Sequence, residues 1–270
     1  MRTAGEKGAG LKGTLRRDWR SCREMVEKTT TLKPMALLST LREQARMHLS
    51  GGLYHNTQIL FAYNSNRIEG SHLSSEQTRY LFETNTIMPT DSALNADDLV
   101  ETINHFCCFD LLLERIGEPL SEPIVKELHQ TLKSSTSQAR ASWFVVGGYK
   151  RIPNEVAMLE TTPPSEVPGA MRRLLEGYAA LSSVALEEIV DLHYHFEAIH
   201  PFQDGNGRVG RLLMFRECLA HGVMPFIITE EQEAFYYRGL QEYPRVKGYL
   251  LDTCRTAQDE YATMVQRFAH

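Results

Sequence analysis

The chain has 270 residues, of which 42% are hydrophobic and 23% charged, and its formal net charge is -5 at pH 7. This composition predicts a folded globular protein and lacks the broad basic surface of a nucleic-acid binder. Its five cysteines form no CxxC pair, and no apolar run is long enough to span a membrane, so we expect reduced thiols in a cytoplasmic protein.

Residues 1–13 are rich in Gly and Lys. We expect a disordered arm there, followed by one helical domain over 14–270. Apolar residues at spacings of three and four predict helices along most of that domain. The predicted helices lie near residues 16–49, 55–69, 96–115, 121–132, 166–181, 186–199, 206–220, 231–241 and 245–268.

The stretch 145–159 departs from the helical pattern. Its β-branched residues, two glycines and Pro153 predict a β-hairpin. A lone hairpin in a helical protein has exposed edges, so it is either a decoration or a docking surface. Within it, Lys150 and Arg151 either contact phosphate or target groups or lie in a solvated turn.

The loop His200-Pro-Phe-Gln-Asp-Gly-Asn-Gly-Arg208 lies between two predicted helices. Its glycines permit a turn that opens directly into the second helix, where successive backbone N–H groups form an anion site. Arg208 and Arg211 are three residues apart and share a helix face. Two guanidinium groups beside such a turn suit a polyphosphate, so the sequence predicts a phosphate site here.

Asp204 and His200 suggest chemistry at this site. A carboxylate beside phosphates calls for a cation, and Mg²⁺ binds through one or two carboxylates plus substrate phosphates, so Asp204 is a candidate metal ligand or else a turn residue. His200 either takes a proton from a hydroxyl or caps its helix. His193 and His195 pack or lie at the surface, and their spacing disfavours zinc.

Residues 200–211 match the Fic family motif HPFx(D/E)GNGRxxR without a departure, and the chain resembles that family over roughly residues 55–245. The resemblance implies an all-α Fic fold with one β-hairpin flap over the active site. It also implies transfer of AMP from ATP to a protein hydroxyl with Mg²⁺, or Mn²⁺ in its place. In the implied roles, His200 is the general base, Phe202 a buried anchor and Asp204 the metal ligand, and the phosphate and ATP contacts are Asp204, Gly205, Asn206, Gly207, Arg208, Val209, Gly210 and Arg211.

A second motif precedes the first. Locally, 65–70 predicts a helix end with Gly70 as its left-handed cap. Glu69 then opposes the helix dipole and calls for a cation, unless it is simply solvated. The segment also resembles the family's inhibitory signature (S/T)xxxE(G/N), which implies an inhibitory helix near 55–70 with functional residues Ser65, Glu69 and Gly70. The implied partner of Glu69 is Arg211, the γ-phosphate ligand.

The resemblance further implies that a target protein docks on the flap 147–161. Nucleotide contacts are expected from the flap at Met158, Leu159, Glu160 and Thr161. They are also expected at Tyr236 and Tyr237, although these two could form an ordinary core pair. Pro244 stands where the family often has Asn, which removes one amide from the nucleotide site.

The expected partners are ATP and a protein substrate, without nucleic acid or membrane, while self-modification and a homodimer stay open. One rival function is removal of AMP from modified targets, or use of another nucleotide donor, at the same site. Another is a nucleotide-binding regulator without turnover. His200 and Asp204 argue against the regulator, because binding alone needs neither a base nor a metal ligand.

Overall fold

The computed structural model describes residues 34–268, except 92 and 157–158. The predicted arm at 1–13, the first part of the predicted helix at 16–49 and Met158 lie outside these residues. The described helices all belong to the unit Leu32–His270. None of them is both long and apolar enough to cross a membrane.

Helices dominate the described part of the chain. In chain order they are α2 (Pro34–Arg46), α3 (Leu53–Ile68), α4 (Ser75–Thr84), α5 (Ala96–Arg115), α6 (Glu122–Lys133), α7 (Val167–Ala179), α8 (Leu186–Ile199), α9 (Asn206–Ala220), α10 (Glu233–Glu242) and α11 (Gly248–Gln266), with short 3₁₀ turns η1 (Gln138–Arg140) and η2 (Glu230–Gln232). Each predicted helix that falls within the described residues is present, with ends shifted by a few residues.

Helix α4 was not predicted. It carries few buried residues, so its apolar pattern is weak. A local signal was present nonetheless, because Ser74 and Gln77 form a capping box in which each side chain accepts from the other residue's backbone N–H.

The predicted hairpin is shorter than the stretch 145–159. Strands β1 (Glu155–Val156) and β2 (Leu159–Glu160) pair antiparallel, with Glu155 opposite Glu160 and Val156 opposite Leu159. The residues before β1 form turns, where Gly147 has a φ of +72° that glycine adopts without steric cost.

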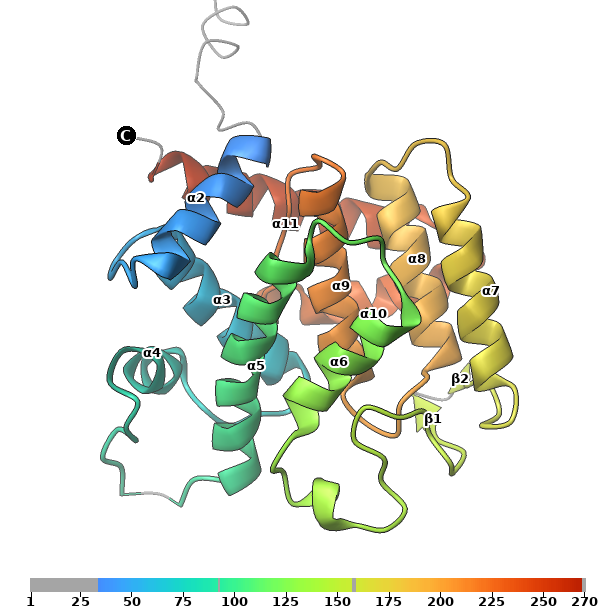
Figure 1. The fold of residues 1–270 in the computed structure, drawn as a ribbon, viewed down its shortest axis with the longest axis horizontal. Coiled ribbons are helices and arrows are strands. Elements are labelled where there is room, and N and C mark those ends of the chain that lie inside the picture. Colours follow the sequence, from blue (N-terminus) through green and yellow to red (C-terminus); the bar gives the residue numbers. More distant parts are fainter. Residues whose placement is uncertain (1–33, 92, 157–158, 269–270) are drawn as a thin grey trace, which may run out of the picture. The chain divides into compact units, whose positions relative to one another are not determined.

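Helix α9 occupies the centre of the helical arrangement. It contacts α2, α3, α5, α6 and α8 (Figure 1). All its residues from Asn206 to Leu219 are buried, so its polar side chains need partners inside the protein. Arg216, for example, is 1% exposed and donates to the backbone carbonyl of Arg115 at 2.9 Å.

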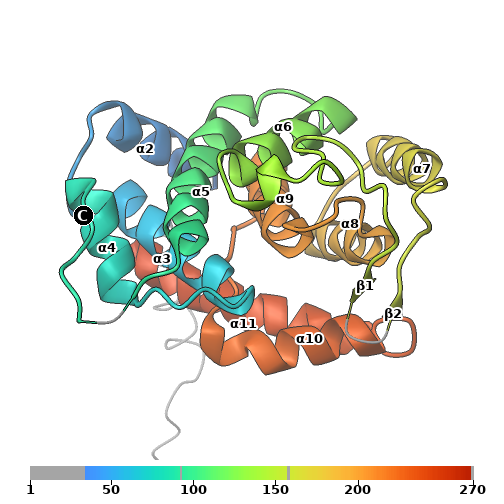
Figure 2. The same ribbon diagram turned by 90° about the horizontal axis from the view of Figure 1, so that it is seen from below.

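Two hydrophobic clusters lie around α9. The larger one joins α2, α3, α5, α6, α7, α8 and α9 and includes Phe202 from the loop after α8. The second contains Met214 and Cys218 of α9 and residues of α8, α10 and α11. Figure 2 shows α10 and α11 running side by side on this second side. The two clusters fix α8 and α9, and with them the loop that connects these helices.

Candidate functional site

The loop between α8 and α9 is held by backbone geometry at both ends. His200 ends α8 with a φ of +51°, and its N–H donates to Phe196 O at 2.9 Å. Gly205 precedes α9 with a φ of +80°. Between them, Asn206 Oδ1 accepts from Phe202 N at 2.8 Å while Asn206 Nδ2 donates to Phe202 O at 2.9 Å. The Asn206 side chain therefore closes the loop through both backbone groups of Phe202.

A histidine from α6 supports the same loop. His129 Nδ1 accepts from Gly147 N at 3.0 Å, so its proton is on Nε2, which donates to Asp204 O at 3.1 Å. Its ring stacks on Phe202 with a centroid distance of 3.9 Å and an interplanar angle of 1°. Burial lowers the pKa of His129 to about 3, so the ring is neutral. Phe202 is fully buried, as predicted, whereas His129 was not singled out.

The first turn of α9 is the place where the sequence predicts an anion site. Helix geometry leaves the amide groups of Asn206, Gly207 and Arg208 without intrahelical acceptors. A Cβ added at Gly207 would overlap Glu69 Oε1, so the Glu69 carboxylate can lie this close to the helix end because residue 207 is glycine. The carboxylate therefore lies where a bound anion would be favoured.

Arg211 joins that carboxylate to α3. Its Nη2 donates to Glu69 Oε1 at 2.9 Å and to Ser65 O at 2.8 Å, and its Nε donates to Ser65 Oγ at 3.1 Å. The Arg211 side chain is 2% exposed, and its Nη1 has no hydrogen-bond partner among the described residues. Gly70 follows with a φ of +90°, which confirms the predicted left-handed cap. The predicted contact between Glu69 and Arg211 is present.

His200 faces a cavity of about 460 Å³. Its side chain is 14% exposed, and its Nδ1 is buried 3.7 Å from Glu197 Oε2, which leaves Nε2 as the more accessible nitrogen. Burial, with a smaller effect of Lys150, lowers the pKa of His200 to about 4, so the imidazole is neutral at pH 7. The residues lining the cavity include Glu69, Thr161, Gly207, Arg211, Tyr236 and Tyr237.

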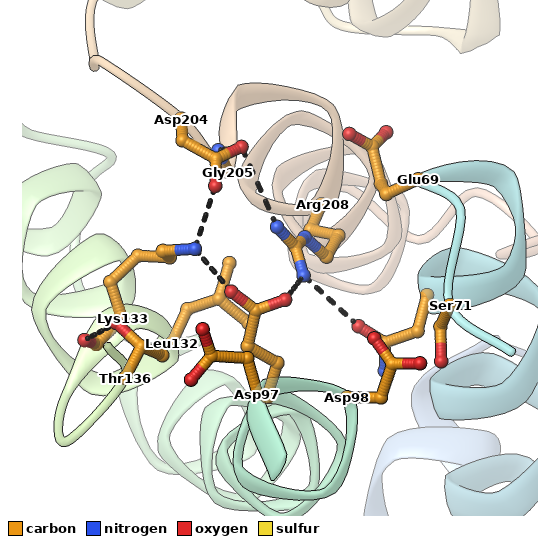
Figure 3. A network of polar contacts seen from close by, with 12 residues as sticks. Glu69, Ser71, Asp97, Asp98, Leu132, Lys133, Thr136, Asp204, Gly205 and Arg208 are labelled. Atoms are coloured by element: carbon orange, nitrogen blue, oxygen red, sulfur yellow. Dashed lines mark hydrogen bonds and ion pairs between the residues drawn. The ribbon is translucent and has the colours of Figure 1, made fainter. Parts of the chain in front are cut away.

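Asp204 lies in a network of alternating charges (Figure 3). Its Oδ2 accepts from Lys133 Nζ at 2.7 Å, and its Oδ1 lies 3.7 Å from Arg208 Nη2. Lys133 and Arg208 both also contact the carboxylate of Glu101. Burial alone would raise the pKa of Asp204, but Lys133 and Arg208 lower it to about 2, so the carboxylate is ionised. Lys133 and Glu101 were not singled out from the sequence.

The remaining predicted site residues lie at the cavity, in the core or in strand β2. Thr161, Tyr236 and Tyr237 line the cavity, and the Tyr236 hydroxyl is 2.7 Å from His193 Nε2. Val209 is fully buried in the larger hydrophobic cluster. A Cβ at Gly210 would clash with Glu197 and His193, so that glycine permits close packing of α9 on α8. Leu159 and Glu160 form β2.

Lys150 is not in a solvated turn. It is 4% exposed, and its Nζ donates to Asn154 Oδ1 at 2.6 Å and to Thr161 Oγ1 at 2.7 Å. Its backbone N–H donates to Pro201 O at 2.9 Å. Lys150 therefore ties the segment around β1 and β2 to the loop that carries His200.

The sequence is similar to a known protein family and to curated proteins. Residues 119–218 match the model of the Fic/DOC family. A protein adenylyltransferase fic-1 of Caenorhabditis elegans is 25% identical over 194 residues, covering 70% of this chain and 37% of that protein. A protein adenylyltransferase Fic of Drosophila melanogaster is 29% identical over 195 residues, covering 66% of this chain and 36% of that protein.

Solved structures share the fold. A Fic domain-containing signaling protein of Bacteroides thetaiotaomicron matches with a TM-score of 0.73 and 23% identity, covering 92% of this chain and 96% of that one. Fic-1 of C. elegans (residues 134–508) matches with a TM-score of 0.61 and 21% identity, covering 92% and 74%. The chain spans little more than a third of the curated relatives it matches. Residues 119–218, which include α6, α8 and the His200 loop, are therefore similar to the Fic/DOC family, and the chain shares its fold with solved Fic proteins.

Proposed function

We propose that this protein is a Mg²⁺-dependent protein adenylyltransferase that moves AMP from ATP to a hydroxyl of a target protein, and that Glu69 keeps its activity low. One observation carries the proposal. The His200 imidazole, the first turn of α9 and Arg211 all border one cavity of about 460 Å³. The curated relatives named protein adenylyltransferase support the same reaction.

The first turn of α9 and Arg211 would bind the triphosphate. The amides of Gly207 and Arg208 offer donors at a helix N-terminus, which favours negative charge. Arg211 offers a planar guanidinium suited to phosphate oxygens. Its unpartnered Nη1 supports this role, because a buried donor without an acceptor is costly unless a ligand satisfies it.

Asp204 fits a magnesium ligand. Its carboxylate is ionised, and its side chain is 35% exposed although Lys133 contacts it. Within the described residues no three His, Cys, Asp or Glu side chains gather around a common metal position. One carboxylate suits Mg²⁺ that is otherwise held by nucleotide phosphates and water. When bound, the ion would neutralise charge on the triphosphate and on the departing pyrophosphate.

His200 would serve as the general base. The target hydroxyl oxygen forms a bond to the α-phosphorus, the bond from that phosphorus to pyrophosphate breaks, and the hydroxyl proton passes to His200. The neutral imidazole has a free lone pair at pH 7, and Nε2 is its more accessible nitrogen. Most of the rate enhancement would come from positioning and charge stabilisation around the phosphates.

Glu69 would restrain this reaction. Its carboxylate lies against Gly207 and binds Arg211, so it occupies the helix end and the guanidinium that the γ-phosphate needs. ATP bound beside it would hold its α-phosphate out of line with the hydroxyl. Since Glu69 caps the C-terminal end of α3 and Arg211 lies in α9, the inhibitor would be N-terminal to the active site in the same chain.

The adenine base of ATP and the target segment would contact different residues around the cavity. Tyr236 and Tyr237 of α10 line it, and tyrosine faces stack on nucleobases. The segment with β1 and β2 would act as the flap, pairing its backbone with an extended target segment. The Thr161 hydroxyl beside Lys150 supports this placement, because it brings the end of the segment to the cavity.

The test is transfer of label from ATP. The Glu69→Gly protein is incubated with Mg²⁺ and α-labelled ATP, alone and with cell lysate, and protein-bound label and intact mass are measured. The proposal expects labelled bands or self-modification by one AMP, absent in His200→Ala. A matched control is His195→Ala, because His195 is exposed on the same helix and does not line the cavity.

Other outcomes separate the rival functions. If a panel of labelled nucleotides showed transfer from a nucleotide other than ATP, the proposed site would stand but its donor would not be ATP. Release of AMP from modified protein without new labelling would indicate the rival function, in which water hydrolyses the bond between AMP and the target. ATP binding without any product, even in Glu69→Gly, would overturn the enzyme proposal in favour of a nucleotide-binding regulator.

A further inference from the structure

Lys133 lies behind the carboxylate proposed to hold the metal. It is the last residue of α6, and its Nζ donates to Asp204 Oδ2 at 2.7 Å (Figure 3). The Lys133 side chain is 1% exposed, whereas the Asp204 side chain is 35% exposed. The ammonium therefore reaches Asp204 from the protein interior. Asp204 Oδ1 accepts from Gly205 N at 2.6 Å, and the exposed part of the carboxylate is accessible to a cation from solvent.

Glu101 and Arg208 complete a closed set of charges with this pair. Lys133 contacts one carboxylate oxygen of Glu101, and Arg208 contacts the other. Arg208 Nη2 then lies 3.7 Å from Asp204 Oδ1. Two carboxylates thus alternate with two cations, and their formal charges sum to zero. The protein therefore already balances the charge of Asp204, the proposed metal ligand.

This balance affects how strongly Asp204 attracts a divalent cation. The Lys133 ammonium competes for the same carboxylate and repels a metal ion nearby, and its burial reduces screening by salt. Glu101 offsets part of that effect, because it shares the Lys133 ammonium. A metal ion alone would therefore bind Asp204 weakly. A metal ion bound to a triphosphate would bind more strongly, because the phosphates also bind the N-terminal end of α9.

We propose that Lys133 is a positioning residue that pairs with Asp204 in the nucleotide-free protein, so that the divalent cation binds only together with its nucleotide. Glu101 weakens the pairing of Lys133 with Asp204, because it binds the same ammonium. The inference rests on the proposed role of Asp204 as the metal ligand. Lys133 itself would not touch the nucleotide, since its side chain is almost fully buried. It acts through the charge and orientation of Asp204.

The experiment measures how strongly nucleotide binding depends on metal. The ligand is α,β-methylene ATP, which cannot transfer AMP, and calorimetry gives its Kd with Mg²⁺ and with EDTA. The ratio of Kd in EDTA to Kd in Mg²⁺ is the metal dependence of binding. It is compared in the full-length wild type, Lys133→Met, Glu101→Gln, the double variant and Asp204→Asn.

The two single variants should change the ratio in opposite directions. Lys133→Met removes the competing ammonium and leaves excess negative charge, so the ratio should rise, by about tenfold if the effect has the size of other changes next to a metal ligand. Glu101→Gln leaves Lys133 paired with Asp204 alone, so the ratio should fall about tenfold. The double variant restores the charge balance, and its ratio should return to within about threefold of the wild type.

A purely structural role of Lys133 and Glu101 predicts a different pattern of Kd values in these variants. If Lys133 and Glu101 only maintained the fold, both single variants would weaken binding with and without metal, and the double variant would be worse than either. Circular dichroism and thermal midpoints identify variants that fail to fold, and Glu101→Gln still tests the inference if Lys133→Met is one of them. An unchanged or lower ratio in folded Lys133→Met would overturn it.

Asp204→Asn separates this inference from the proposed function. If Asp204 is the ligand, its variant should bring the ratio close to one. A wild-type ratio in Asp204→Asn would disprove the metal role of Asp204 and thus the premise. A collapsed ratio in Asp204→Asn together with unchanged ratios in the other variants would disprove the role of Lys133 alone. No binding of the analogue to the wild type would contradict the proposed function itself.

Discussion

Glu69 and Arg211 are 142 residues apart in the chain, yet Arg211 Nη2 donates to Glu69 Oε1 at 2.9 Å in the part of the protein where a triphosphate would bind. The Arg211 side chain is 2% exposed and that of Glu69 21%, so solvent weakens this pair less than a surface ion pair. Ser65 holds the same guanidinium from the other side. Arg211 therefore stays in place when Glu69 leaves.

Replacing Glu69 should release the site. In Glu69→Gly, Arg211 keeps its two bonds to Ser65 and gains a free donor for phosphate. A hydrogen bond to a charged group is worth about 1.5–3 kcal/mol, so ATP affinity and AMP transfer should both rise by about tenfold or more. Calorimetry with α,β-methylene ATP and the labelled-ATP assay measure the two effects.

Glu69→Gln tests whether charge or only space is involved. The amide keeps the shape of the side chain but not its charge, so its activity should lie between wild type and Glu69→Gly. Glu231→Gly is the matched control, because this glutamate is exposed and does not line the cavity. If Glu69→Gly bound and transferred no better than this control, the inhibitory role would be wrong.

The pH dependence of transfer should reflect an unusually acidic imidazolium. The pKa of His200 is lowered to about 4, chiefly by burial and then by Lys150. Because the base works unprotonated, kcat/KM in Glu69→Gly should be flat between about pH 6 and 8 and fall only as the pH approaches this value. A rate profile from about pH 4 to 8, with transfer measured from labelled ATP, checks both the flat region and the fall.

Lys150 provides the discriminating variant. Lys150→Met removes a positive charge that disfavours the imidazolium, so the acid limb should move to higher pH. Arg151→Met, at the exposed neighbouring residue, should leave the limb in place. A limb near pH 6.5 in Glu69→Gly with Lys150 intact would show that burial does not lower the pKa of His200 as the structure indicates.

The structure assigns His129 a supporting role whose cost can be measured. In His129→Phe the stacking on Phe202 is retained, but Asp204 O and Gly147 N each lose a partner. Leaving a buried polar group unsatisfied costs about 1–3 kcal/mol, so urea unfolding should show a loss of about 2 kcal/mol or more. His195→Phe, at an exposed histidine, should change stability by less than about 0.5 kcal/mol. Equal effects of the two variants would contradict this role.

Local patterns predicted most of the helices and the loop at the site. The apolar stripes of α8 and α9 and the glycines between them required no information about distant residues. Gly70 was likewise predicted as a left-handed cap from its place after a helix, and its φ is +90°. The contact between Glu69 and Arg211 came only from the family resemblance, because nothing local to either residue names the other.

The supporting residues could not be predicted because each comes from another helix. Lys133 contacts Asp204 across 71 positions, and Glu101 contacts Arg208 across 107. A lone charge on an amphipathic helix is usually solvated, so neither residue stood out. The hydrogen bonds from the Asn206 side chain to the backbone of Phe202, which close the loop, were not predicted either. The hydrogen-bond and ion-pair partners of buried polar groups depend on how the helices pack, and not on the spacing of residues in the sequence.

Glu197 carries a carboxyl group that the fold keeps protonated. Burial, with a smaller effect of Glu69, raises its pKa to about 8, and its Oε1 has no hydrogen-bond partner among the described residues. The folded-state pKa lies above the unfolded value of about 4.5, so this group costs no stability below that value. As the pH rises from about 4.5 to 8, folding must retain a proton that the unfolded chain releases, and stability is lost.

Glu197→Gln should therefore stabilise the protein at neutral pH and not in acid. At pH 7 the proton held by the native carboxyl costs up to about 3 kcal/mol, which the neutral amide avoids. Urea unfolding should show this gain at pH 7 and a difference below about 0.5 kcal/mol at pH 4. Glu187→Gln, at an exposed glutamate of the same helix, should show neither effect. A Glu197→Gln gain that stays constant between pH 4 and 7 would mean that packing, and not the buried proton, sets the stability of this site.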